Sequence, residues 1–405
     1  MKKLIFHIGQ HKTGTTTLQS SFHASRDALL KHDVLYPRAL AGYNHRLIKG
    51  YFAGPEGAEN LERRKFKGDA TAITRRARKA WNLIQEDIRS QQPETTILSA
   101  ECFERIGTEE CFPEFIREIS ELADEVVFVA YLRAPSSRYL SGYQQLLKTS
   151  PTKVPANMNS LFRVPLEPFF EFPQVKLEVH KFDRSTLRGG SIVADFAQRY
   201  LPACAARDLR TPNGDENSSL SAEAMAVLED IHTGSQPAQF SNCGPFSPKL
   251  SKRILRLDAE FPGHSRPRYK QGIATIIHEA CTDLGWLRDT FGIVFTPPEA
   301  SVVPVKLPRE QLSRVRAICI VDESRYRALW KLVGESFETL DGLEIQARQK
   351  VEAEGTKARS PDKRKPWRLS FMYHTTRKVF RFMTKPIRSN PLSRKLRSVL
   401  RGKLR

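Results

Sequence analysis

The first 19 residues of this 405-residue chain limit the possible folds more than any other segment does. Residues 4–6 are apolar, residues 7–14 form a polar stretch with two glycines, and residues 15–19 begin a segment with helical spacing. This order predicts a strand, a loop and the start of a helix. Glycines let backbone N–H groups turn toward an anion, and a helix start adds unpaired donors and the positive end of its dipole. The segment therefore predicts an anion-binding loop in an α/β protein.

The position of the lysine separates this loop from the Walker A loop of nucleoside triphosphatases. In the pattern G-x-x-x-x-G-K-[ST] the lysine follows the second glycine and reaches the β- and γ-phosphates, while the next hydroxyl holds Mg²⁺. Here Lys12 lies inside the loop and Thr15 occupies the place of the Walker lysine. A lysine in this place points at the 5′-phosphate end of a ligand and its leaving bond. We therefore expect a ligand that needs neither a third phosphate nor a metal.

A second strand-to-helix segment lies at residues 125–143. Residues 125–133 have the composition of a buried parallel strand, and Pro135 falls in the first turn of the helix predicted to follow. Arg133 ends that strand, and Ser141 lies eight residues later. An arginine at a strand end and a serine two turns into the next helix can converge on one further phosphate.

Together the two segments resemble the sulfotransferases that use 3′-phosphoadenosine 5′-phosphosulfate (PAPS), most closely the bacterial carbohydrate-type members. The run Lys12-Thr13-Gly14-Thr15-Thr16 is similar to that family's 5′-phosphosulfate motif, and Arg133 with Ser141 is similar to its 3′-phosphate pair. The resemblance extends to about residue 345. It implies a P-loop-NTPase-like fold with a central parallel sheet flanked by helices. It also implies PAPS as cosubstrate, no metal, and a hydroxyl of a carbohydrate or glycolipid as sulfuryl acceptor.

Sulfuryl transfer needs a base for the acceptor hydroxyl and a cation near the leaving oxygen. Lys12 suits the cation. Glu101 follows a predicted strand, as the catalytic glutamate does in the carbohydrate sulfotransferases that the chain resembles, so we assign it as the base. A capping or salt-bridged glutamate is the alternative. His45 is the second candidate base, because histidine is the usual base in the cytosolic small-molecule branch. His7 and His11 flank the loop, where a structural or anion-donating role is more common.

Two other functions stay open. A P-loop kinase needs an acidic residue at a strand end to organise Mg²⁺. Glu101 meets that need, whereas the strand before Arg133 ends in arginine. A non-catalytic, membrane-peripheral protein would keep the nucleotide pocket without a base. Metal dependence separates the kinase from the transferase.

Charge divides the chain into two parts. Residues 348–405 contain 19 Lys and Arg against 3 acidic residues, and residues 1–347 carry only +4 of the net charge of +20. We therefore expect a sulfotransferase-like domain over 1–347 and a basic, helical or disordered tail over 348–405. Within residues 366–404, apolar and aromatic side chains such as Leu369 and Phe380 recur at helical spacing opposite basic ones, which is typical of helices that bind anionic membranes. A solvated polyanion-binding tail is the alternative, and the apolar face argues against nucleic acid.

The remaining composition predicts a cytoplasmic protein, peripheral at the inner face of the membrane through its tail. Six cysteines without a C-x-x-C pair favour reduced thiols, and no apolar stretch approaches the ~20 residues of a membrane-spanning helix. Between the motifs we expect a helix over 73–88, strands over 96–100 and 175–182, a helix capped by Ser221, and helices near 273–284 and 322–340. Residues 54–68 and 235–272, rich in polar residues and glycine or proline, predict loops.

Overall fold

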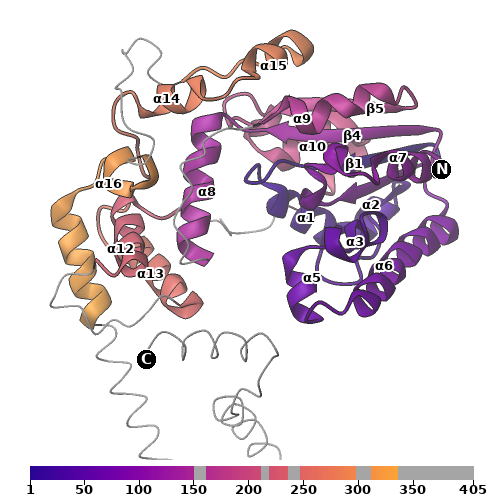
Figure 1. The fold of residues 1–405 in the computed structure, drawn as a ribbon. Helices are drawn as coiled ribbons and strands as arrows, with labels where there is room; N and C mark the ends of the chain where they lie inside the picture. Colours follow the sequence, from indigo (N-terminus) through magenta and orange to yellow (C-terminus); the bar gives the residue numbers. More distant parts are fainter. Residues whose placement is uncertain (150–160, 211–218, 236–246, 298–311, 336–405) are drawn as a thin grey trace, which may run out of the picture. The chain divides into compact units, whose positions relative to one another are not determined.

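The computed structural model describes residues 1–149, 161–210, 219–235, 247–297 and 312–335 (Figure 1). Contacts along the chain separate Met1–Glu338 from Thr339–Arg405, and every described residue lies in the first of these units. The predicted tail over 348–405, with its membrane-binding segment 366–404, falls outside the described residues. Of the helices in the described ranges, none combines the length and the apolar character needed to cross a bilayer.

Five parallel strands form the centre of the structure. They are β1 (Lys3–His7), β2 (Val34–Leu35), β3 (Thr95–Ser99), β4 (Glu125–Leu132) and β5 (Val175–Lys181), in the spatial order β2-β3-β1-β4-β5. In the centre of the sheet Ile5 pairs with Ile97 on one side and with Val127 on the other. The predicted α/β class and central parallel sheet are confirmed, and the architecture is compatible with a P-loop-like fold.

Helices make up most of the rest of the structure. The α-helices are α1 (Thr15–Ala24), α2 (Arg26–Leu30), α3 (Lys49–Phe52), α4 (Gly54–Gly57), α5 (Asn60–Lys65), α6 (Ala70–Gln91), α7 (Phe112–Ser120), α8 (Pro135–Thr149), α9 (Arg163–Leu166), α10 (Ile192–Tyr200), α11 (Ala203–Arg207), α12 (Ala222–Thr233), α13 (Pro248–Glu260), α14 (Ile273–Glu279), α15 (Leu284–Phe291), α16 (Val315–Ile318) and a helix over residues 323–335. The 3-10 helices are η1 (Arg46–Ile48), η2 (Glu101–Phe103), η3 (Ile106–Thr108), η4 (Glu167–Glu171) and η5 (Arg188–Gly190).

Alternate residues of the strands bury two separate apolar faces, because successive side chains of a strand point to opposite sides. Leu4 and Phe6 of β1 pack into a core with α6 and α7, which includes Trp81. Ile5 packs on the other face into a core with α1 and α10, which includes Phe196. Both faces are covered by helices, as is usual for an all-parallel sheet.

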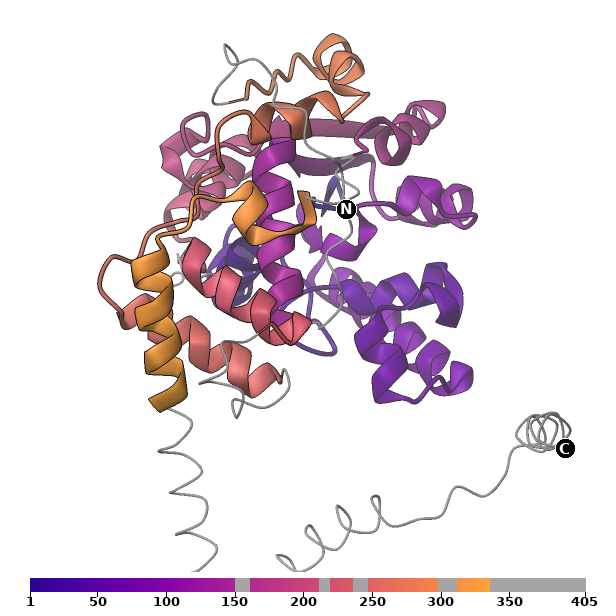
Figure 2. The ribbon, with the colours of Figure 1, turned by 60° about the vertical axis from the view of Figure 1, so that its left-hand side comes forward.

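A third core lies beyond α8. Tyr143 and Leu147 of α8 pack with α12, α13, α16 and the helix over 323–335, around buried residues such as Met225 and Trp330. In both ribbon views α8 stands between the sheet and these helices (Figures 1 and 2). Because α8 starts directly after β4, one of its ends lies at the carboxyl edge of the sheet. The helices of the third core, α12, α13, α16 and the helix over 323–335, form a helical lobe that α8 connects to that edge.

Several predicted elements are confirmed, and each of two predicted loops contains at least one helix. The helix over 73–88 is part of α6, the strand over 175–182 is β5, and Ser221 caps α12 by accepting a hydrogen bond from the backbone N–H of Ala224. Residues 54–68 contain α4 and α5, where Glu62 binds Arg76 of α6. Residues 248–260 form α13, whose apolar positions face the third core while its Lys and Arg residues occupy other positions.

Candidate functional site

The loop between β1 and α1 has the backbone conformation of an anion cradle. Gly9, Lys12 and Gly14 have φ angles of 52°, 71° and 76°, in the left-handed region. For lysine this conformation costs about 1–2 kcal/mol, and such strain concentrates at ligand sites. Gly14 precedes the first residue of α1, no side chain caps the helix, and its first turn contains no acidic residue. The N–H groups of this turn are therefore left for an anion.

Two buried polar atoms beside Gly9 have no hydrogen-bond partner among the described residues. They are Thr15 Oγ1 and His7 Nε2, on side chains that are buried at the ends of α1 and β1. A Cβ atom on Gly9 would lie 3.1 Å from Thr15 Oγ1 and 3.5 Å from His7 Nε2, so both atoms border the space that this glycine leaves open. Buried polar atoms are normally paired. Their position fits a ligand or ordered water in the loop.

Arg133 is tied directly to the loop. Its side-chain Nη1 donates to the carbonyl oxygen of Lys12 at 3.0 Å, and its backbone N–H donates to Gln10 Oε1 at 2.9 Å. Thr13, by contrast, turns inward and donates from Oγ1 to the Gln10 carbonyl oxygen at 2.6 Å, so its hydroxyl braces the loop. Within the described ranges Arg133 has no carboxylate partner. The two predicted phosphate-binding segments thus form one connected unit.

One face of α8 is turned toward the loop. Gln145 accepts a hydrogen bond from Lys12 Nζ at 2.8 Å, and Arg138 contacts Glu104 at 2.7 Å. Ser141 lies three residues after Arg138 and four before Gln145, and residues at these spacings share one face of a helix. The predicted phosphate-binding serine therefore lies on the helix face that meets the loop.

Positive charge gathers around Arg133. Burial lowers the pKa of its guanidinium, and the nearby charges of Arg266 and Arg184 lower that pKa further. Burial likewise lowers the pKa of Lys12, with a further contribution from the charge of Arg133, and Lys148 of α8 is close enough for Lys12 to lower its pKa. Like charges held together with few carboxylates are costly unless an anion joins them. The cluster suits a ligand with more than one negative group.

Glu101 lies beside the loop and is paired with His11. Its Oε1 is 2.7 Å from His11 Nδ1. Although burial raises the pKa of Glu101, the hydrogen bond and charge of His11 and the charge of Lys12 together hold that pKa below its usual value. The same hydrogen bond raises the pKa of His11. The structure thus brings Glu101, His11 and Lys12 together at the end of β3.

The second candidate base does not fit its predicted role. His45 is 2% exposed, its Nδ1 accepts from the backbone N–H of Ser99 at 3.1 Å, and its Nε2 lies 3.1 Å from the carbonyl oxygen of Pro37. Since Nδ1 accepts, Nε2 carries the proton and donates. Burial lowers the pKa of His45 to about 4. His45 therefore braces the sheet edge from inside, where an acceptor hydroxyl has no access to its ring nitrogens.

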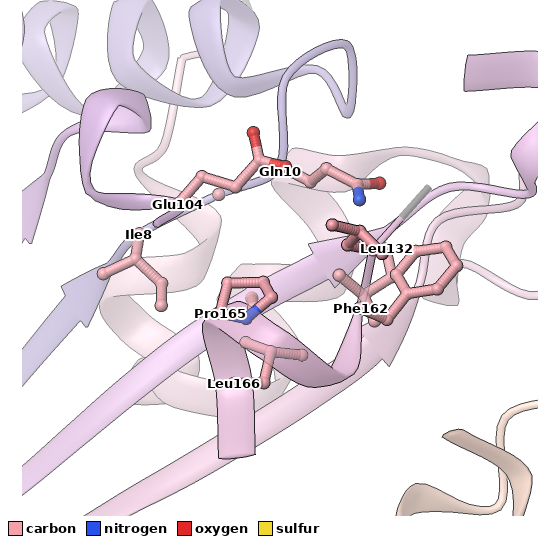
Figure 3. A pocket seen from close by; sticks show the side chains of 10 residues that line it. Ile8, Gln10, Glu104, Leu132, Phe162, Pro165 and Leu166 are labelled. Atoms are coloured by element: carbon pink, nitrogen blue, oxygen red, sulfur yellow. The ribbon is translucent and has the colours of Figure 1, made fainter. Parts of the chain in front are cut away.

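A small hollow lies beside the loop, with Gly9 and Gln10 among its lining residues. Figure 3 shows Gln10 and Glu104 at one side of it and apolar side chains, such as Phe162 and Leu166, around the rest. Neither Lys12 nor Arg133 lines this hollow. It is a gap in the packing behind the loop, distinct from the surface where the basic residues gather.

Several residues of the site were not predicted from the sequence. Gln145 lies four residues after Ser141, and Glu104 lies three residues after Glu101. Helical spacing could therefore have placed each of them beside a predicted site residue. Arg184 and Arg266 come from distant segments, and only the folded chain brings them to Arg133. In the part of the chain that the structure describes, no three His, Cys, Asp or Glu side chains are grouped as metal ligands.

No protein-family model matches the chain, and a search of curated proteins finds no significant match.

Proposed function

We propose that the protein is a sulfotransferase that moves a sulfuryl group from PAPS to a hydroxyl of a carbohydrate or glycolipid. The observation that carries this proposal is the hydrogen bond from Arg133 to the Lys12 carbonyl oxygen, at 3.0 Å. It joins a loop suited to a 5′-phosphosulfate to an arginine suited to a second phosphate. A nucleotide with phosphates at both its 5′ and 3′ positions matches this pair better than one with a single phosphate chain.

The residues of the site have distinct roles in this proposal. The N–H groups of the loop and of Thr15 and Thr16 would bind the 5′-phosphosulfate, while Arg133 and Ser141 would bind the 3′-phosphate. The two unpaired atoms on His7 and Thr15 support a ligand in the loop. Lys12 would stabilise charge on the leaving oxygen. Its ammonium group is bound by Gln145 in this structure, so it would exchange that partner for the donor.

Nucleotide binding tests this proposal most directly. We expect calorimetry to show that 3′-phosphoadenosine 5′-phosphate (PAP) binds without added metal and far more tightly than AMP, which lacks the 3′-phosphate. ATP with Mg²⁺ is the second comparison. Equal affinity for PAP and AMP, or an absolute requirement for Mg²⁺, would contradict the proposal that the protein is a sulfotransferase.

A magnesium-dependent kinase is the competing proposal. It is favoured by one observation, the position of Glu101 directly after β3, next to β1 in the sheet, where an acidic residue can organise Mg²⁺. In this structure, however, the Glu101 carboxylate lies 2.7 Å from His11 Nδ1, so it already has a partner other than a metal ion. Tight binding of ATP only in the presence of Mg²⁺ would support the kinase.

Membrane docking through residues 366–404 is proposed from the sequence alone. Each Lys or Arg near an anionic surface contributes ~1 kcal/mol to binding. The full chain should therefore sediment with phosphatidylserine vesicles at low salt and be released in part at high salt. A chain ending at residue 347 should bind PAP but remain in the supernatant. Failure of the full chain to sediment would contradict the docking proposal and leave the sulfotransferase proposal intact.

A further inference from the structure

The His11 side chain contacts the Glu101 carboxylate and is the more exposed of the two. Its Nδ1 is 2.7 Å from Glu101 Oε1, and 61% of the His11 side chain is exposed, against 28% of the Glu101 side chain. The ring therefore presents Nδ1 to a carboxylate, while the His11 side chain as a whole is more exposed than that of Glu101. Of the two residues, His11 is the one that an incoming molecule can reach more easily.

The second ring nitrogen has no hydrogen bond within the described ranges of the chain. His11 Nε2 is 3.8 Å from Glu104 Oε2, which is longer than a hydrogen bond. The backbone of His11 is fixed nonetheless, because its N–H donates to Glu104 Oε2 at 3.1 Å and Glu104 in turn binds Arg138. The loop thus holds the imidazole in place while Nε2 stays available.

Glu101, in contrast, is already engaged. Its carboxylate contacts His11 Nδ1, and the backbone N–H and ammonium group of Lys12 lie near enough to lower its pKa further. Each of these interactions stabilises the ionised carboxylate and makes it a weaker proton acceptor. A carboxylate held in this way is better suited to orient a histidine than to accept the proton itself.

We propose that His11 is the proton acceptor of the site and that Glu101 orients it through the Nδ1–Oε1 hydrogen bond. This inference rests on the proposed sulfotransferase function and changes the role first assigned to Glu101. As the acceptor oxygen bonds to sulfur, its hydroxyl proton moves to His11 Nε2. The bond between sulfur and the 5′-phosphate oxygen breaks at the same time, and its electron pair remains on that oxygen beside Lys12. PAP and the sulfated acceptor are the products.

The two assignments predict different pH profiles. The charged groups that face His11 are Glu101, Glu104, Glu59 and Arg138. The hydrogen bond to Glu101 outweighs the opposing effects of burial and Arg138 and raises the His11 pKa above 6.5. A neutral His11 acceptor therefore gives turnover that increases as pH rises through this raised pKa. A Glu101 acceptor, with a pKa below 4.5, gives turnover that is already constant well below neutral pH.

An experiment on the PAP complex tests the dyad without knowledge of the natural acceptor. We would record ¹⁵N–¹H NMR spectra of histidine-labelled full-length protein with saturating PAP over a pH titration. We expect neutral His11 to carry its proton on Nδ1, to titrate above pH 6.5, and to shift toward 6.5 in the variant Glu101→Gln. Protonation on Nε2 in the neutral ring, or a titration that Glu101→Gln leaves unchanged, would overturn the proposal.

Turnover provides the second measurement, with PAPS as donor and water as the sulfuryl acceptor. His11→Asn should keep PAP affinity and lower sulfate release ~10²-fold or more, the range for a positioned base. The matched control is His23→Asn, an exposed histidine of α1, which should behave as the wild type. Wild-type turnover in His11→Asn, or turnover in the unmodified protein that is flat from pH 5 to 8, would return the role to Glu101. A wild-type protein that fails to bind PAP would instead contradict the proposed function.

Discussion

Two arginines of this protein lie in opposite kinds of surroundings. Arg325 is 8% exposed in the helical lobe, where its guanidinium contacts Glu223 at 3.0 Å, Asp258 at 2.9 Å and Ser221 Oγ at 2.7 Å. It also donates to the backbone carbonyl oxygen of Pro262 at 3.0 Å. Arg133, at the carboxyl edge of the sheet, donates to one carbonyl oxygen and has no carboxylate partner among the described residues. The Arg325 guanidinium thus has several acceptors, whereas the Arg133 guanidinium has one among the described residues.

The difference shows how the chain uses charge for structure in one region and reserves it for a ligand in the other. A buried cation surrounded by carboxylates has no capacity left for an anion from outside, and its removal exposes the cost of the charges that remain. A half-buried cation with other cations nearby has the reverse property. Its removal costs the free protein little and the complex much.

Replacement of Arg325 should produce the largest effect. Arg325→Met leaves Asp258 and Glu223 buried without their partner, which should lower the free energy of unfolding by ~3–5 kcal/mol. Urea unfolding followed by circular dichroism measures the change. The matched control is Arg256→Met, which removes an exposed pair with Glu260 and should change stability little. Equal stability of the two variants would contradict the structural role of the buried network.

Replacement of Arg133 should give the opposite pattern. Arg133→Ala should weaken PAP binding by ~2–4 kcal/mol, because a phosphate loses its charge-assisted hydrogen bonds. Affinity for AMP should change far less, since AMP has no 3′-phosphate, and calorimetry with both nucleotides measures the difference. Arg133→Lys keeps the charge without the forked geometry and should lie between the two. An equal loss for PAP and AMP would assign Arg133 to loop structure alone.

Replacement of Thr15 should give the smallest effect, with opposite directions for stability and for PAP affinity. Thr15→Val removes a buried hydroxyl that has no partner among the described residues, so unfolding free energy should stay constant or rise by up to ~1 kcal/mol. PAP affinity should fall by ~1.5–3 kcal/mol if the hydroxyl binds a charged oxygen. Thr96→Val is the matched control, because Thr96 Oγ1 is also buried without a partner in the described part of the chain but lies on β3. A loss of affinity in both variants would refute a specific role for Thr15.

The sequence predicted those parts of the site that are local in the chain. β1 and β4 follow from continuous apolar runs, and the loop follows from its two glycines and the helix behind it. Lys12 and Arg133 could be paired because both follow strands of one parallel sheet, whose carboxyl ends share an edge. The position of Glu101 beside the loop follows for the same reason, since β3 is the neighbour of β1.

The contacts that decide the chemistry could not be predicted in this way. The pairing of His11 with Glu101 depends on the side-chain direction of two residues about 90 positions apart, which strand order alone does not specify. His45 has a sequence neighbourhood no different from that of an exposed histidine, and only the packing of Tyr36 and Ser99 around it shows that it is buried. Helix α13 was not predicted, because the polar, glycine and proline residues of 235–272 indicated a loop, although Leu250 and Ile254 have helical spacing and are buried.

The order of the strands has a consequence for the time at which the site can form. The loop follows β1, but β1 pairs with β3 and β4, which lie 92 and 122 residues later in the chain. Pairings this distant make folding slow and keep the loop without its neighbours until much of the chain is present. A ribosome-bound chain that ends between residues 20 and 132 would contain the complete loop motif and lack Arg133. Acquisition of nucleotide binding during synthesis would therefore report closure of the central sheet.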